Sequence, residues 1–344
     1  MQFRIRVPMI LGLFIACCHS SASAQINSGN YVHCARIPVV EPYYDPACHT
    51  TGCYQDPGPC WLGEATFDVL IFDRSDADSR TIVTEVGTGD PLLNTTDLGF
   101  PVTAGFRFNL VLPGSNGYDL VFNYLGAQFE NSREHSTAAA TYDFFEFPTL
   151  SPATGTSFET SYTSTLRSFE IGGRLREWSR FAPLAGMRYI QLEDQFDRIS
   201  GDATEALQIS ETDNELWGFQ IGGEALLWDS GFVRLQSTVK GGVFYNDLQL
   251  STGGGTITSG AATIDPTATF SGDRAAFFGE MNLELVYRFC PQVAVRVGYT
   301  AMWLDGVALA PDQHDNFILQ TGIGTFDCGS VIYHGSYVGG EFIW

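Results

Sequence analysis

The chain has 344 residues, which is enough for one large barrel or two ordinary domains. Its formal net charge is −21, from 39 acidic and 18 basic side chains. Binding to nucleic-acid phosphates needs a basic surface, so this charge argues against a nucleic-acid partner. The acidity has two interpretations: a well-solvated exterior, or acidic loops that gather divalent cations or other partners.

The first 24 residues have the features of a signal peptide. Arg4 and Arg6 form a basic start, residues 7–18 form an apolar run, and residues 22–24 give a small-x-small cleavage pattern. The apolar run is too short to cross a membrane as a helix. Nothing later in the chain offers roughly 20 continuous apolar residues, so no transmembrane helix is expected. We predict that residues 1–24 direct export.

Residues 25–60 are rich in Pro, Gly, Tyr and Cys and have no sustained periodicity. This composition predicts an irregular leader segment on the periplasmic side. Export permits disulfides, so the leader cysteines are expected to pair among themselves. Zinc binding with His33 and His49 is the alternative, but the spacing lacks a paired CxxC motif. No metal or cofactor is therefore expected, and the candidate disulfide residues are Cys34, Cys48, Cys53 and Cys60.

From Trp61 onward the chain alternates apolar and polar residues over stretches longer than ordinary soluble strands. In residues 277–289 one face is apolar from Phe277 to Phe289 apart from Gly279, and the other carries Glu280, Glu284 and Arg288. Aromatic residues stand at the strand ends. A tilted strand needs about 9–11 residues to cross a bilayer. The pattern predicts transmembrane strands with lipid-facing apolar sides.

Connections alternate between short turns and long polar loops, which is the arrangement of outer-membrane barrels. We predict that residues 61–344 form an all-β, antiparallel up-and-down barrel of ten strands in the outer membrane, with outer-membrane lipid around it. The short turns would face the periplasm and the long loops the exterior. The strands are expected near residues 61–73, 98–112, 117–130, 158–177, 181–194, 214–228, 231–246, 273–289, 292–304 and 331–343.

Twelve strands are the alternative, because residues 316–326 could supply two more segments. Cys290 and Cys328 distinguish the two counts. With ten strands they lie on opposite sides of a bilayer about 30 Å thick. A disulfide requires Cα atoms within roughly 7 Å, so the bridge is possible only with twelve.

Several strand patterns resemble the beta-barrel porin seven family, known chiefly from planctomycete-type bacteria. The resemblance covers roughly residues 61–344 and implies an outer-membrane barrel without naming a substrate or catalytic residues. This chain departs from the family in its cysteine-bearing leader and in ending on Trp344, where Phe is commoner. The segments that carry the resemblance are residues 184–192 (LAGMRYIQL), 217–223 (WGFQIGG), 283–287 (LELVY), 296–300 (RVGYT) and 333–344 (YHGSYVGGEFIW).

The inward faces of the predicted strands carry charges of both signs. In a wide barrel such charges line an aqueous pore and set its selectivity. In a narrow barrel they pair across the lumen and fill it, and ten to twelve strands lie near the narrow limit. The expected lumen-facing charged residues are Arg107, Arg174, Arg188, Arg234, Lys240, Glu224, Glu280, Glu284, Arg288, Arg296 and Glu341, joined by Arg176 and Glu170.

No catalytic residues are expected. An outer-membrane hydrolase would need a Ser or Asp beside a His at one rim, as at His135–Ser136 or His314–Asp315. Lone loop histidines are far more often solvated, so the protein is not expected to be an enzyme. The functional prediction is a porin-like barrel that passes small polar or ionic solutes through a narrow charged lumen. The alternative is a closed structural or surface-interaction barrel with working loops. The oligomeric state is left open.

Overall fold

The structure is a computed structural model of the chain. It describes residues 62–77, 79, 81–85, 88–114, 117–136, 142–144, 157–175, 180–200, 206–253, 257–259, 262–264, 268–315, 317–318, 323–324 and 326–344. The predicted signal peptide, the leader and its cysteines Cys34, Cys48, Cys53 and Cys60 lie outside these residues, as does Arg176.

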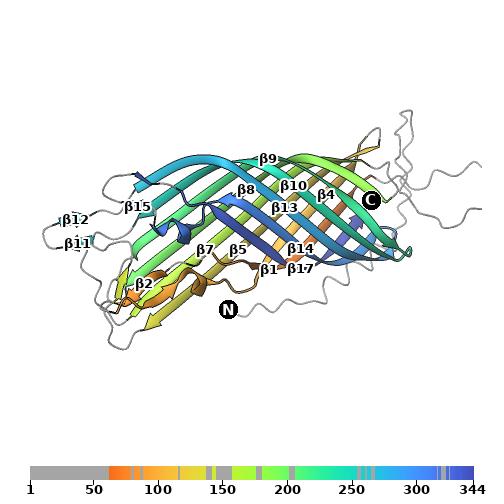
Figure 1. Cartoon of the computed structure of the whole chain (residues 1–344). Helices are drawn as coiled ribbons and strands as arrows, with labels where there is room; N and C mark the ends of the chain where they lie inside the picture. Colours follow the sequence, from red (N-terminus) through yellow and green to blue (C-terminus); the bar gives the residue numbers. More distant parts are fainter. Residues whose placement is uncertain are drawn as a thin grey trace, which may run out of the picture.

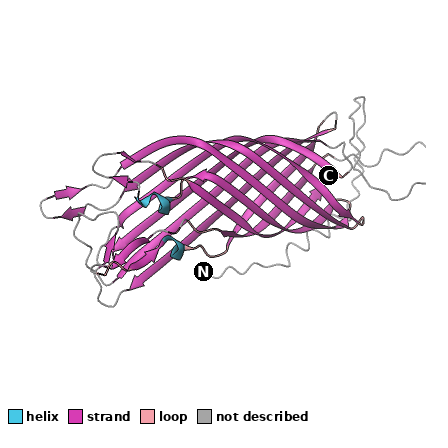
Figure 2. Ribbon diagram, in the orientation of Figure 1, coloured by secondary structure: helices cyan, strands magenta, loops and turns pink. Residues whose placement is uncertain are grey.

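Ten strands form one closed antiparallel barrel, which confirms the predicted fold class (Figures 1 and 2). The first and last strands close it, with Glu64 opposite Ile343 and Arg74 opposite Tyr333. Around the barrel the order is β1-β17-β14-β13-β10-β9-β8-β7-β5-β4. The strands are β1 (Glu64–Arg74), β4 (Thr103–Pro113), β5 (Tyr118–Ser136), β7 (Ser157–Leu175), β8 (Phe181–Ser200), β9 (Ala206–Asp229), β10 (Val233–Gly253), β13 (Ala268–Cys290), β14 (Val293–Val307) and β17 (Gly329–Ile343).

The twelve-strand alternative is wrong. The segments that it needed, β15 (Phe317–Ile318) and β16 (Ile323–Gly324), pair with each other in a separate two-stranded sheet. Cys290 ends β13 at a short turn, whereas Cys328 precedes β17 at the opposite end of the barrel, and no disulfide joins them.

Several strands continue well past their predicted outer ends. β8 runs to Ser200 and β9 starts at Ala206, while β10 runs to Gly253 and β13 starts at Ala268. Residues 195–213 and 247–272 were expected to be long polar loops. The alternation persists there, but its outward side is polar: Phe196, Leu248 and Leu250 point inward and are buried. An apolar outer face marks the part of a strand in lipid, and here the strands extend beyond it.

Smaller elements cover the long-loop end of the barrel (Figure 1). β2 (Thr81–Glu85), β3 (Pro91–Asn94) and β6 (Tyr142–Phe144) form a three-stranded sheet. The others are β11 (Ile257–Ser259), β12 (Ala262–Ile264) and the short 3₁₀ helices η2 (Thr95–Leu98) and η3 (Ala310–Asp315). No helix within the described ranges has the length and apolar character to cross a membrane.

The outer wall carries an exposed apolar band. Phe219 and Ile221 on β9 are 70% and 72% exposed. Trp217 and Trp303 stand at the edge toward the long loops, and Phe289 at the short-turn edge. Aromatic girdles that flank a band of apolar side chains are typical of barrels in contact with lipid.

Arginine within this band should destabilise the folded barrel. We expect Leu283→Arg to lower the free energy of unfolding in lipid vesicles by about 2–4 kcal/mol if the side chain lies near the midplane. Gln249→Arg is the matched control, because Gln249 also points outward but lies beyond the apolar band. Denaturant titration of both variants measures the difference, and equal costs would contradict the assignment of the band.

Candidate functional site in the barrel interior

Charged side chains meet across the lumen around Asp68 of β1. Its side chain is fully buried. The Arg107 guanidinium lies 2.8 Å from one carboxylate oxygen, and Arg296 Nε lies 3.2 Å from the other. Arg107 also donates a hydrogen bond of 2.9 Å to Asn282 and stacks over the Tyr337 ring at 4.3 Å. One carboxylate therefore holds arginines from β4 and β14 on either side of β1.

A second group of ion pairs lies on the facing wall. Arg188 Nη1 lies 2.6 Å from Glu280, and its Nε donates to Ser168 at 2.7 Å. Lys240 Nζ lies 2.7 Å from Glu170. Asn282 donates to Glu280 at 2.6 Å and so joins this group to Arg107.

Glu284 completes the network. It accepts hydrogen bonds from Arg296 and Gln236, and another of 3.0 Å from Tyr337. Because ionised groups in a low-dielectric interior need partners, these mutual contacts stabilise charges that are almost completely buried. We call the connected set the ionic layer: Asp68, Arg107, Glu170, Arg188, Lys240, Glu280, Asn282, Glu284 and Arg296.

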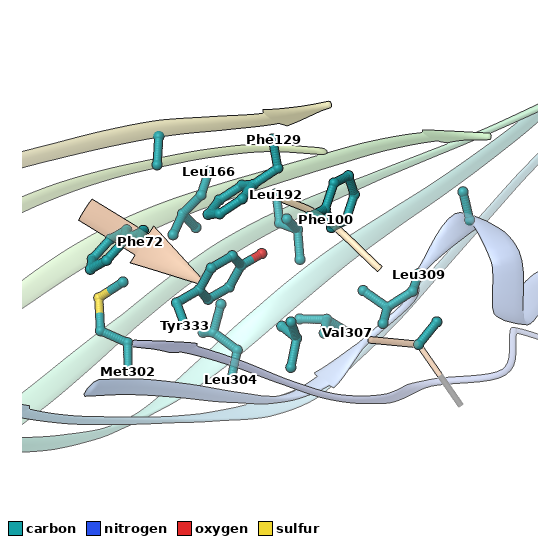
Figure 3. Packing of buried hydrophobic residues seen from close by; sticks show 14 of the residues in the cluster. Phe72, Phe100, Phe129, Leu166, Leu192, Met302, Leu304, Val307, Leu309 and Tyr333 are labelled. Carbon is teal, nitrogen blue, oxygen red and sulfur yellow. The ribbon is translucent and has the colours of Figure 1, made fainter. Parts of the chain in front are cut away.

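An apolar core fills the lumen on the long-loop side of the ionic layer (Figure 3). Aromatic rings from different strands meet there, such as Phe129 and Tyr333 with centroids 5.6 Å apart. Val307 at the end of β14 and Leu309 and Phe100 from the connecting segments pack onto the same core. Each of the ten barrel strands has an inward residue that belongs to this core or to the ionic layer and is at most 5% exposed to solvent. These residues are Leu70, Arg107, Leu125, Leu166, Ile190, Leu216, Phe244, Phe278, Met302 and Tyr333.

One ion pair is embedded in the apolar core. Arg74 Nη2, at the end of β1, lies 2.8 Å from Asp194 of β8, and both side chains are fully buried. Tyr162 donates a hydrogen bond of 2.6 Å to the same carboxylate oxygen. The Arg74 guanidinium lies 5.0 Å from the Phe100 ring centroid and 5.8 Å from that of Tyr333. This pair ties opposite walls of the barrel together.

The segment that follows β14 folds inward over the core. Gly306 has a φ of +82°, a conformation that favours glycine. Asn214 of β9 then accepts from Ala308 N at 2.7 Å and donates to Ala308 O at 2.8 Å. Asn246 of β10 donates to Gly306 O at 3.0 Å. These hydrogen bonds from two buried Asn side chains hold residues 306–308 inside the long-loop end of the barrel.

A cavity of about 290 Å³ remains on the short-turn side of the ionic layer. Arg174 lines it and lies 3.0 Å from Asp119 and 2.9 Å from Glu224. Arg234 and Arg288 line it as well, 3.2 Å and 3.8 Å from Glu341. Further lining residues at the turns and strand ends are Glu64, Arg180, Asp229 and Ile343. The cavity is thus a charged recess that ends at the ionic layer.

The structure places every described residue of the predicted lumen set on an inward face. The ionic layer contains Arg107, Glu170, Arg188, Lys240, Glu280, Glu284 and Arg296. The cavity is lined by Arg174, Glu224, Arg234 and Arg288, and Glu341 lies behind the last two. The sequence analysis missed Asp68, Asp119, Arg74, Asp194 and Asn214. Asp68 was detectable, because it alternates with Phe67 and Val69, which point outward.

The exterior beyond the apolar band is acidic on one side. Asp213 lies opposite Glu193 in the β8–β9 register, and Asp247 of β10 lies opposite Glu215 of β9. Partial burial and the charges of Glu193 and Glu215 raise the pKa of Asp213 to about 6. Within the described part of the chain, no three His, Cys, Asp or Glu side chains converge as a metal site would require. The side chains of His135, Ser136, His314 and Asp315 are outside that part.

A family model described as "Putative beta barrel porin-7" matches residues 129–328, more than half of the chain. The chain belongs to this family. No curated protein matches its sequence.

Several solved structures are similar to this chain over most of its length. The outer membrane protease OmpT from Escherichia coli is 10% identical, with 82% of this chain and 97% of that chain covered and a TM-score of 0.46. The translocator domain of autotransporter NalP from Neisseria meningitidis is 10% identical, with 83% and 90% covered and a TM-score of 0.39. The toluene transporter TodX from P. putida is 10% identical, with 83% and 90% covered and a TM-score of 0.30.

Breaking one buried pair should cost far more than breaking an exposed pair. Arg188→Met leaves the Glu280 carboxylate buried without its closest cation, so we expect about 3–5 kcal/mol of destabilisation. Arg167→Met is the control, because the Arg167–Glu193 pair lies on the exterior and is worth less than about 1 kcal/mol. Urea unfolding in vesicles compares the two, and similar losses would contradict a structural role for the ionic layer.

Proposed function

We propose that this porin-7 family member resides in the outer membrane with its short turns in the periplasm. We further propose that its lumen is closed and that its long-loop end is the working part. The charges in the lumen then hold the barrel walls together, and no catalytic step is assigned to the protein. This is the surface-interaction alternative of the sequence analysis, and it is favoured over passage of small solutes.

The observation that carries the proposal is the filled cross-section. All ten strands contribute inward side chains that solvent barely reaches, and these side chains form the ionic layer and the apolar core. A solute that crosses the barrel would have to separate the side chains of the ionic layer and those of the apolar core. An ionic solute would also lose its hydration in the apolar core, which is costly without replacement contacts.

The length of the strands supports a role for the outer part. β9 has 24 residues. A tilted strand needs only about 9–11 residues to cross a bilayer, so roughly half of β9 projects beyond it. The projecting exterior carries acidic residues such as Glu193, Asp213 and Asp247. We propose that this surface meets divalent cations or cationic partners outside the cell.

Planar-bilayer conductance tests the proposal against the pore alternative. The closed barrel should give no discrete current steps at any applied voltage, because the ionic layer and apolar core block the axis. Insertion is verified on the same protein in vesicles, by the heat-dependent migration shift of a folded barrel in electrophoresis. Discrete steps whose ion selectivity changes in Arg296→Glu would overturn the closed barrel and establish solute passage.

A further inference from the structure

The cavity on the short-turn side of the ionic layer plays no part in the function proposed for the long-loop end. If the barrel only had to be closed, side chains could fill this cavity as they fill the lumen in the apolar core. We propose that this cavity binds the oxyanion group of a small solute, a carboxylate or a phosphate, between Arg234 and Arg288. The inference goes beyond the proposed function, because binding in a recess requires no passage through the barrel.

Two arginines of the cavity share the carboxylate of Glu341. Arg234 of β10 and Arg288 of β13 lie 3.2 Å and 3.8 Å from its carboxylate oxygens. The Glu341 side chain is only 1% exposed, whereas those of Arg234 and Arg288 are 26% and 32% exposed. The shared acid is therefore behind the two guanidinium groups, and a solute in the cavity meets the guanidinium groups first.

Two other cations of the cavity have closer carboxylate partners. Arg174 lies beside two carboxylates, Asp119 and Glu224. Lys240 has Glu170 at 2.7 Å. Among the described residues, Arg234 and Arg288 share the Glu341 carboxylate as their ion-pair partner, and both guanidinium groups line the cavity. Pairs of guanidinium groups bind carboxylate and phosphate oxygens through strong charge-assisted hydrogen bonds.

Glu64 is one of the lining acids that would compete with an entering anion. Glu64 lines the same cavity from the start of β1, close enough to Arg234 for their charges to interact. An anion bound beside Arg234 would be repelled by the Glu64 carboxylate. Removing that charge should strengthen binding, whereas removing either arginine should weaken it. Opposite effects of two neighbouring substitutions would be hard to produce by a general change in stability.

Size and access define the solute. A cavity of about 290 Å³ holds a small molecule rather than a chain segment of many residues. Its lining includes Arg180, Asp229 and Arg288 near the short turns, so entry is from that end. The barrel wall surrounds the cavity laterally, which favours a free solute over a lipid headgroup with the same phosphate chemistry.

Calorimetric titration of the detergent-solubilised full chain with sodium phosphate and sodium acetate tests the proposal. We expect saturable binding of both anions. Arg288→Gln and Arg234→Gln should each weaken it about tenfold, the effect of losing one charge-assisted contact. Glu64→Gln should tighten it. Arg167→Gln, on the exterior, should leave it unchanged, and the heat-dependent migration shift checks that each variant is folded.

Four outcomes would overturn the proposal. The first is the absence of saturable heat with either anion. The second is equal binding by the folded wild type and both arginine variants. The third is an equal response to choline chloride, which would show that the cavity does not select anions. The fourth is binding of micellar phosphatidylglycerol, but not of free phosphate or acetate, lost in Arg288→Gln; this would assign the arginines to a lipid headgroup. None of these measurements depends on conductance.

Discussion

The structure depends on charge pairing across a narrow lumen, and Asp68 is the centre of that pairing. Its buried carboxylate holds Arg107 and Arg296, which come from strands on either side of β1. β1 itself joins the first and last parts of the chain, through β17 and β4. Removing water from these charges is costly, so each must find a partner. The pairing joins β4, β1 and β14 along the inner wall.

Space for these pairs comes from glycines on the inward faces. A side chain at Gly339 would collide with the Asp68 carboxylate, and one at Gly222 would approach the Lys240 side chain to 3.1 Å. Ten strands enclose little more than their own side chains. Long arginine and lysine side chains fit because their neighbours have none. The apolar core follows the same rule, with Gly218 beside the ring of Phe244.

Alternation in the sequence favoured ten strands over twelve, and it predicted their order along the chain and the faces of residues such as Leu283 and Arg296. It did not predict where β9 begins or where β10 ends, because an apolar outer face stops at the lipid boundary while the hydrogen-bonded ladder continues. Nor did it predict the Arg74–Asp194 pair. That contact joins β1 to β8 across the barrel, and it depends on tilt and on the shear between strands, which local periodicity does not encode.

The inward fold of residues 306–310 was missed for a related reason. Asn214 and Ala308 are 94 positions apart, and the segment has no alternation to mark it. A buried asparagine in a strand is a signal that a backbone segment approaches the wall, since its amide needs partners. The sequence shows Asn214 and Asn246 at inward positions, but it does not show which segment they hold.

The central claim is that the cavity is sealed from the long-loop side, and cysteine accessibility tests it most directly. In Thr238→Cys the new thiol lies in the cavity. A charged, membrane-impermeant thiol reagent added to intact cells should leave residue 238 unmodified, and should modify it once the outer membrane is permeabilised, as read by peptide mapping. Gln249→Cys, exposed on the exterior beyond the apolar band, should react in intact cells. Equal modification of residue 238 before and after permeabilisation would contradict a sealed lumen.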